Sequence, residues 1–113
     1  MSQPVVFSDV LNQPLGLAIR VAEPLGSPVA EVACHEHETQ DGLSAGVWVC
    51  SPGRWRRKVM QREFSHFVEG HCFFIPDNGS AIEIRAGDAV LFPENCAGTW
   101  DVKQTIRKSF LIL

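Results

Sequence analysis

The stretch of sequence that decides the fold runs from residue 53 to residue 98, and its clearest part is Glu63-Phe64-Ser65-His66-Phe67-Val68-Glu69-Gly70. Short apolar runs in this stretch alternate with turn signals, among them Pro76-Asp77-Asn78-Gly79 and Ala86-Gly87-Asp88. Apolar runs that end in Gly, Pro, Asn or Asp are typical of antiparallel strands joined by tight turns. The pattern predicts an all-β fold, either a barrel or a sandwich.

The same pattern continues on both sides of this stretch. Gly70 is expected to make a tight bend between two strands that pair with each other, and Asn78-Gly79 is expected to close a hairpin. No segment has the periodicity and capping of a helix. We expect short strands at residues 5–7, 17–21, 29–37, 43–50, 55–60, 63–69, 71–75, 81–85, 89–92, 98–103 and 105–113.

With 113 residues, the chain has the length of a single domain with its own core. Four prolines interrupt the first 28 residues. Residues 1–28 are therefore expected to form an N-terminal arm with short strands, and residues 29–113 the barrel. Because the arm and the apolar C-terminal run 110–113 suit subunit contact, we also expect a homodimer.

The composition argues against two classes of partner. The net charge of −3 comes from mixed signs, so no basic surface for nucleic acid is expected. No apolar segment approaches the roughly 20 residues that span a bilayer, and the first residues lack the pattern of a signal peptide. The four cysteines have no C-x-x-C spacing, so we expect free, buried thiols in a reducing compartment. These features predict a cytoplasmic protein that binds neither nucleic acid nor a membrane.

A set of short blocks in the second half of the chain resembles the cupin superfamily, in particular the small single-domain cupins (RmlC-like jelly rolls) related to the cupin domain of ureidoglycine aminohydrolase. The resemblance covers residues 46–113. It implies a double-stranded β-helix, which is a jelly-roll barrel, usually dimeric and with its ligand site inside the barrel. The blocks are Gly46-Val47-Trp48, Pro52-Gly53-Arg54-Trp55, Glu63-Phe64, His66-Phe67-Val68-Glu69-Gly70, Ala86-Gly87-Asp88, Phe92-Pro93, Gly98-Thr99-Trp100 and Arg107-Lys108.

The resemblance also implies where a metal ion would bind, but most of the ligands are missing. Metal-binding cupins place two His and one Glu in a first motif and a third His in a second motif. Glu63 matches the Glu, whereas Arg56-Arg57-Lys58-Val59 stands where the first two His are expected and Gly98 stands in the third position. Zinc and iron sites need three or four ligands at close range. We therefore expect no metal ion at this site and no cofactor.

An alternative metal site is the segment Cys34-His35-Glu36-His37-Glu38. His35 and His37 would share one strand face, because alternate residues of a strand point the same way. The two glutamates then fall on the other face, and a polar loop follows. The competing interpretation is a solvated strand end.

Glu63 is the candidate for chemistry. Burial in a barrel would raise its pKa and a nearby cation would lower it, and either makes it a candidate general base or ligand-orienting group. The competing interpretation is a structural carboxylate paired with Arg57, Lys58 or Lys108. The expected ligand pocket consists of Trp48, Cys50, Trp55, Arg57, Glu63, Ser65, Trp100 and Lys108.

Three functions are compatible with these residues. The leading hypothesis is a small cupin that binds a small polar or anionic molecule in its barrel, with tryptophan walls and positive charge from Arg57 or Lys108. The second is a metal-dependent enzyme of the aminohydrolase or isomerase type, which follows from fold analogy. The third is a non-catalytic structural or regulatory dimer, whose seven Phe and three Trp would fill the barrel. The sequence does not decide whether a reaction is catalysed.

Overall fold

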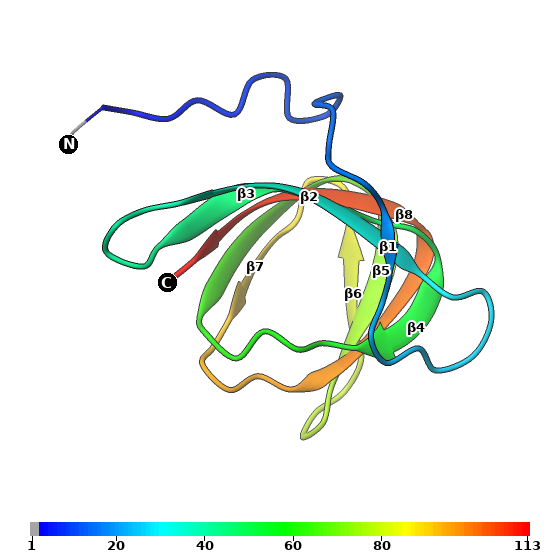
Figure 1. The fold of residues 1–113 in the computed structure, drawn as a ribbon. Helices are drawn as coiled ribbons and strands as arrows, with labels where there is room; N and C mark the ends of the chain where they lie inside the picture. The colour runs from blue at the N-terminus through cyan, green and yellow to red at the C-terminus, as the bar shows by residue number, and fades with distance from the viewer. Residues whose placement is uncertain (1–2) are drawn as a thin grey trace.

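The computed structural model describes residues 3–113, and this part of the chain forms eight strands and no helix (Figure 1). The all-β prediction is confirmed, and no helix that could cross a membrane occurs among the described residues. The strands are β1 Ile19–Arg20, β2 Glu31–Glu38, β3 Ser44–Cys50, β4 Gly53–Arg56, β5 Glu63–Pro76, β6 Ile82–Arg85, β7 Ala89–Phe92 and β8 Gly98–Ile112.

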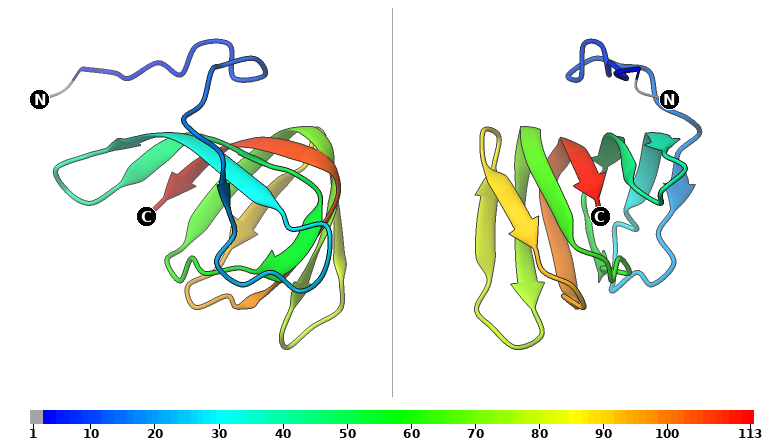
Figure 2. Two further views of the ribbon diagram at one scale, coloured as in Figure 1. Left: turned by 45° about the vertical axis from the view of Figure 1, so that its right-hand side comes forward. Right: turned by 90° about the vertical axis from the view of Figure 1, so that its left-hand side faces the viewer.

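The two longest strands, β5 and β8, form the centre of one antiparallel sheet. They pair with each other from Glu63 opposite Ile112 to Pro76 opposite Gly98. The other side of β8 pairs with β3 and β4, and the other side of β5 pairs with β7 and β6. Strands β2 and β1 continue the sheet beyond β3. The sheet curls on itself into the predicted jelly-roll barrel (Figures 1 and 2).

The prediction of a tight bend at Gly70 is wrong, because β5 is one continuous strand. Gly70 has a φ of 91°, and the pairing register with β8 shifts on both sides of Glu69. A Cβ atom at position 70 would lie 2.1 Å from the Thr105 carbonyl oxygen. Glycine is therefore needed for a β-bulge that kinks the strand without reversing it. The predicted hairpin at Asn78-Gly79 is confirmed, since β6 pairs back onto β5.

Three further strand predictions need correction. The strands predicted at 98–103 and 105–113 are one strand, β8. The basic strand predicted at 55–60 begins earlier and ends at Arg56, and residues 57–62 leave the sheet. Residues 5–7 form no strand. The Arg57 backbone N–H still donates a hydrogen bond to the Gly98 carbonyl oxygen at 2.9 Å, and its side chain is buried.

Apolar side chains fill one end of the barrel, which we call the packed end and define as Cys72, Phe74, Ile84 and Val102. All four are at most 3% exposed. The Phe74 ring also packs edge-on against Trp100, with ring centroids 5.1 Å apart. Aromatic pairs of this geometry add to the stabilisation that burial gives.

The cysteines are free thiols in different environments. Cys50 and Cys72 are buried, as predicted, and Cys96 is partly buried. Cys34 is exposed on β2, so the prediction that all four thiols are buried is wrong. The reason is its place on the part of β2 whose residues are mostly exposed.

The N-terminal segment runs along the outside of the barrel (Figure 2). Strand β1 pairs with β2, and the Arg107 guanidinium donates hydrogen bonds to the carbonyl oxygens of Val10 and Gln13 at 3.2 and 3.1 Å. The Phe7 ring lies 6.0 Å from the His35 ring on β2. These contacts hold the segment against the outer face of β2 and β8.

Candidate functional site

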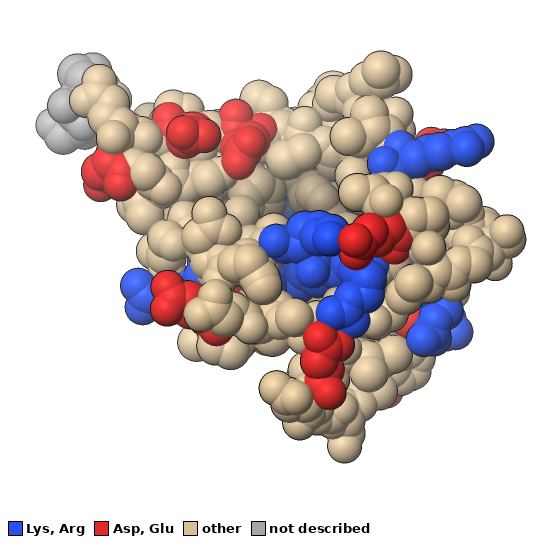
Figure 3. Space-filling view, turned by 60° about the horizontal axis from the view of Figure 1, so that its bottom comes forward, with Lys and Arg blue, Asp and Glu red and all other residues tan. Residues whose placement is uncertain are grey.

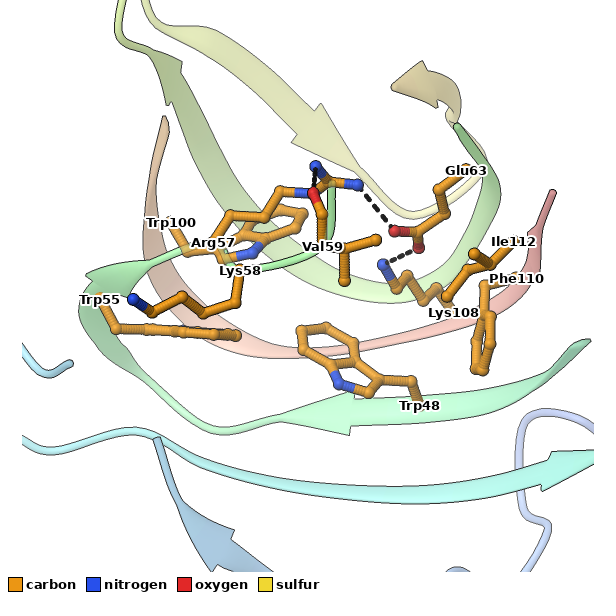
Figure 4. A pocket seen from close by; sticks show the side chains of 10 residues that line it. All are labelled: Trp48, Trp55, Arg57, Lys58, Val59, Glu63, Trp100, Lys108, Phe110 and Ile112. Atoms are coloured by element: carbon orange, nitrogen blue, oxygen red, sulfur yellow. Dashed lines mark hydrogen bonds and ion pairs between the residues drawn. The ribbon is translucent and has the colours of Figure 1, made fainter. Parts of the chain in front are cut away.

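A cavity of about 130 Å³ opens at the other end of the barrel, and we call this region the cavity end (Figure 4). Its size is close to the ~150 Å³ apolar cavity that admits benzene in another protein. A small organic molecule therefore fits. The lining residues are Trp48, Trp55, Arg57, Lys58, Val59, Glu63, Trp100, Lys108, Phe110 and Ile112.

Strand alternation decides which residues of β5 face the barrel interior. Glu63, Ser65 and Phe67 are buried, whereas Phe64 and His66 between them are exposed. His66 therefore lies on the outward face of β5, opposite to Glu63. The inward face of β5 thus begins with a carboxylate and a hydroxyl, and continues with an aromatic ring.

The Glu63 carboxylate is the centre of a buried polar network. Its Oε1 accepts a hydrogen bond from Arg57 Nη2 at 2.9 Å. Its Oε2 accepts one from Lys108 Nζ at 2.6 Å and one from Ser65 Oγ at 2.7 Å. Glu63 is 3% exposed, and Arg57 and Lys108 are each 4% exposed. These are charge-assisted hydrogen bonds in a region of low dielectric, where they are stronger than at a surface.

Arg57 is held in place by several groups at once. Its Nη1 donates hydrogen bonds to the carbonyl oxygens of Val59, at 2.6 Å, and Cys96, at 2.9 Å. Its guanidinium carbon lies 4.2 Å from the centroid of the Phe92 ring, which is a cation–π contact. Arg57 is therefore fixed by the irregular segment after β4 as well as by Glu63.

Lys108 points from β8 toward the middle of the cavity wall (Figure 4). Its register places it opposite Trp48 of β3 and Phe67 of β5. Its Nζ lies 4.6 Å from the Trp48 ring centroid and 5.4 Å from that of Trp100. The ammonium group therefore has one carboxylate partner and aromatic faces around it.

The buried charges shift the pKa values of one another. Burial raises the pKa of Glu63, but Lys108, Ser65 and Arg57 together lower it more, so that it falls below its usual 4.5. Burial has the largest effect on Lys108 and lowers its pKa below 10.5, which Arg57 reinforces and Glu63 opposes. The site holds the carboxylate ionised and makes the ammonium easier to deprotonate than that of a lysine in water.

Three tryptophans form a continuous aromatic wall. The ring centroids of Trp48, Trp55 and Trp100 lie 6.0 to 6.4 Å from one another, with interplanar angles of 30° to 37°. They come from β3, β4 and β8, which are neighbours in the sheet. Such a wall offers stacking and apolar contact to a small ligand.

The structure brings most of the predicted pocket residues together. Ser65 and Cys50 do not line the cavity: Ser65 lies behind Glu63 as its hydrogen-bond donor, and Cys50 is buried in the core. Burial raises the pKa of the Cys50 thiol to about 12, which suits a structural role. Sequence reasoning missed four lining residues, Lys58, Val59, Phe110 and Ile112.

Two of the missed residues could have been predicted from the sequence. Counting in steps of two along β8 from Lys108 gives Phe110 and Ile112, because alternate residues share a face. Lys58 and Val59 lie in the irregular segment after β4, where no periodicity indicates direction. The Lys58 ammonium lies 2.9 Å from a Glu23 carboxylate oxygen, and both side chains are about half exposed.

Positive charge gathers on this side of the barrel. A view from the bottom of Figure 1 shows Lys and Arg side chains in and around a hollow, with acidic side chains beside them (Figure 3). Lys58 and Arg56 have acidic partners, Glu23 and Asp77 respectively. In contrast, Arg57 and Lys108 share the single carboxylate of Glu63.

The donor set does not fit the metal ion that the resemblance to cupins implies. Both oxygens of Glu63 already accept hydrogen bonds from cations, which would repel a divalent ion. Within residues 3–113, no three His, Cys, Asp or Glu side chains are close enough together to hold a metal ion, and this includes His35 and His37 on β2. Both histidines are exposed, and the structure gives them no third ligand.

Comparison with known proteins identifies a family at the level of sequence. The sequence model of the EutQ-like cupin domain family matches residues 37–110. This range covers β3 to β7, most of β8, and every cavity-lining residue except Ile112. No curated protein is similar enough to the chain to count as a match.

Solved structures share the fold. The EutQ protein of Clostridium difficile is 16% identical, with a TM-score of 0.66 over 80% of this chain and 75% of that chain. A putative ethanolamine utilization protein Q of Salmonella typhimurium is 13% identical, with a TM-score of 0.64 over 89% of this chain and 96% of that chain. A DUF861 protein of unknown function from Pseudomonas syringae is 22% identical, with a TM-score of 0.76 over 93% of this chain and 46% of that chain.

Proposed function

The chain belongs to the EutQ-like cupin domain family, and we propose that its barrel binds a small anionic molecule without the His-rich metal site of other cupins. The observation that carries this proposal is the charge beside the cavity. Two buried cations, Arg57 and Lys108, face one buried carboxylate, Glu63. The site therefore has an excess of one positive charge.

An excess buried charge is costly unless something balances it. The effective penalty for one uncompensated ion inside a protein is several kcal/mol. An anion in the cavity would reduce this penalty and would also find hydrogen-bond donors. Lys108 has three N–H groups, of which one is directed at Glu63. The remaining donors lie at the cavity wall.

The lining favours an anion with an apolar body. Apart from Arg57, Lys58, Glu63 and Lys108, the cavity wall consists of aromatic and aliphatic side chains. A planar or branched group of about the size of benzene would fill the space against the tryptophans. We therefore favour small monocarboxylates over sugars or nucleotides.

Thermal unfolding with matched ligands tests this function. Small carboxylates such as benzoate and 3-methylbutanoate are compared with the neutral benzyl alcohol and 3-methylbutanol. We expect the acids to raise the melting temperature and the alcohols to leave it nearly unchanged, because a ligand stabilises the state that binds it. If acids and alcohols change the melting temperature equally, both in the wild type and in Lys108→Met, the proposal of anion binding is rejected.

We also propose that the chain forms a homodimer. Phe64 of β5 and Leu91 of β7 are direct neighbours on the outer face of the sheet, and they are 48% and 64% exposed. A second copy would cover such apolar side chains. Light scattering should give a molecular mass of twice that of the chain. The variant Phe64→Glu, which puts a charge in the proposed interface, should lower the measured mass. A monomer in the wild type would exclude this assembly.

A further inference from the structure

We propose that Lys108 acts as a nucleophile and forms a reversible iminium bond with a small carbonyl compound that carries an anionic group, such as a 2-oxo acid. The inference rests on the proposed binding of anions at the same cavity and adds the class of substrate and a covalent step. It is carried by the position of the Lys108 amine at the wall of the cavity, against the Glu63 carboxylate.

The surroundings of Lys108 are those that make a lysine amine reactive. Lysines that attack carbonyl groups lie in apolar pockets or beside a second cation, because both favour the neutral amine. Here the Nζ lies within 5.7 Å of the ring centroids of Trp48, Phe67, Phe92 and Trp100. Arg57 is the second cation, since it shares the carboxylate with Lys108. The burial of Lys108 lowers its pKa, which also favours the neutral amine.

Glu63 is placed to move the protons of the reaction. Its Oε2 is 2.6 Å from Nζ and can accept a proton from the ammonium. The neutral amine then attacks the carbonyl carbon, and a new C–N bond forms as the C=O double bond becomes a hydroxyl group. Glu63 relays protons from nitrogen to oxygen until the hydroxyl leaves as water.

The proton balance of this sequence closes within the site. One ammonium and one carbonyl compound become one iminium ion and one water molecule, and the total charge does not change. Glu63 ends as a carboxylate beside the iminium cation, which replaces the ammonium as its partner. Arg57 keeps its hydrogen bonds to Val59 and Cys96 and is available to the anionic group of the substrate.

Trapping by reduction tests the proposal. The full-length protein is incubated with pyruvate or 2-oxobutyrate and sodium cyanoborohydride, which converts an iminium ion to a stable secondary amine, and is then digested and mapped by mass spectrometry. The chain contains three lysines: Lys103, which does not line the cavity, is the internal control, and Lys58 is a second comparison within the cavity. Lys58 and Lys103 are more than half exposed. We expect modification at Lys108 to be about tenfold faster or more, because the cavity holds the 2-oxo acid beside this amine.

Two variants separate the roles of the residues. Lys108→Arg keeps the positive charge but cannot form an iminium ion, so it should lose the adduct and keep the stabilisation by anions. Glu63→Gln should still form the adduct, about a hundredfold more slowly, because a positioned general base typically contributes 10²–10⁴ in rate. An adduct that forms as fast in Glu63→Gln as in the wild type would overturn the proton-transfer role.

The test also distinguishes this inference from the function on which it rests. Lactate and 2-hydroxybutyrate match the two 2-oxo acids but have no carbonyl group. If they raise the melting temperature like the 2-oxo acids and Lys108 is modified no faster than Lys58 and Lys103, anion binding stands and the iminium proposal is overturned. If none of the four acids stabilises the protein and no adduct forms at Lys108, both are overturned.

Discussion

The two ends of the barrel are built from the same strands but differ in how their interiors are filled. At the packed end, β5 and β8 contribute Phe74 and Val102, which meet other apolar side chains in a core without charge. At the cavity end, the same strands contribute Glu63 and Lys108, which form an ion pair in the cavity wall. Trp100 contacts both ends, since it packs on Phe74 and lines the cavity.

This difference separates stability from function within one sheet. Apolar packing contributes most of the favourable free energy of folding, whereas buried ion pairs contribute little or cost free energy. The packed end contains the apolar packing that stabilises the fold. The cavity end keeps three buried charges and open space, and both lower stability unless a ligand uses them.

The largest expected effect lies at the packed end. Phe74→Ala should lower the free energy of unfolding by about 3–5 kcal/mol, since it removes a buried ring and leaves a cavity. Ile82→Ala on the neighbouring strand β6 is the control, because Ile82 pairs with Phe74 but is 46% exposed, and its truncation should cost far less. Urea unfolding measures both. Equal losses for the two variants would mean that the packed end does not dominate stability.

The second effect breaks the charge network at the cavity end. Glu63→Ala leaves Arg57 and Lys108 buried together without a counter-charge, and it should cost about 2–4 kcal/mol. Adding Lys108→Met should restore at least half of this loss, because one of the two unpaired cations is then removed. If the double variant Glu63→Ala/Lys108→Met is as unstable as Glu63→Ala in the same urea experiment, unpaired positive charge is not the cause of the lost stability.

The pH dependence of stability gives a smaller effect and sharpens the comparison further. Since the pKa of Glu63 is lower in the folded protein than its usual 4.5, the unfolded chain binds a proton there more readily as the pH falls. The stabilisation by Glu63 is therefore present above pH 4.5 and is lost as the pH falls through the folded pKa. Lowering the pH from about 6 to about 3 should reduce the free energy of unfolding of the wild type more than that of Glu63→Gln, as measured by urea unfolding at each pH. If the free energies of unfolding of the two proteins fell equally with pH, Glu63 would not be the source of the pH dependence.

The barrel and much of its interior could be predicted from local sequence patterns. Alternation and turn residues give the all-β fold, and the ordered cupin blocks give the jelly roll. The resemblance also directed attention to Glu63. Its partners, Arg57 and Lys108, were among the three cations considered for it, and the structure selects them over Lys58.

What the sequence could not give depends on contacts between distant segments. Gly70 with positive φ is compatible with a bend or a bulge, and the long pairing of β5 with β8 decides for the bulge. The direction of Arg57 is set by carbonyl groups of Val59 and Cys96, in irregular segments without periodicity. Cys50 shares the inward face of Trp48, yet its short side chain lies in the core and does not reach the cavity.

The central claim is that the excess positive charge at the cavity end binds an anion, and calorimetric titration tests it most directly. Benzoate and benzyl alcohol are titrated into the wild type and into Lys108→Met, at equal ionic strength. We predict that the wild type binds benzoate about ten- to a hundredfold more tightly than benzyl alcohol, because hydrogen bonds to charged groups contribute about 1.5–3 kcal/mol. Lys108→Met should lose this preference. Equal affinities of the two compounds for the wild type, or a preference for benzoate that Lys108→Met retains in full, would contradict the claim.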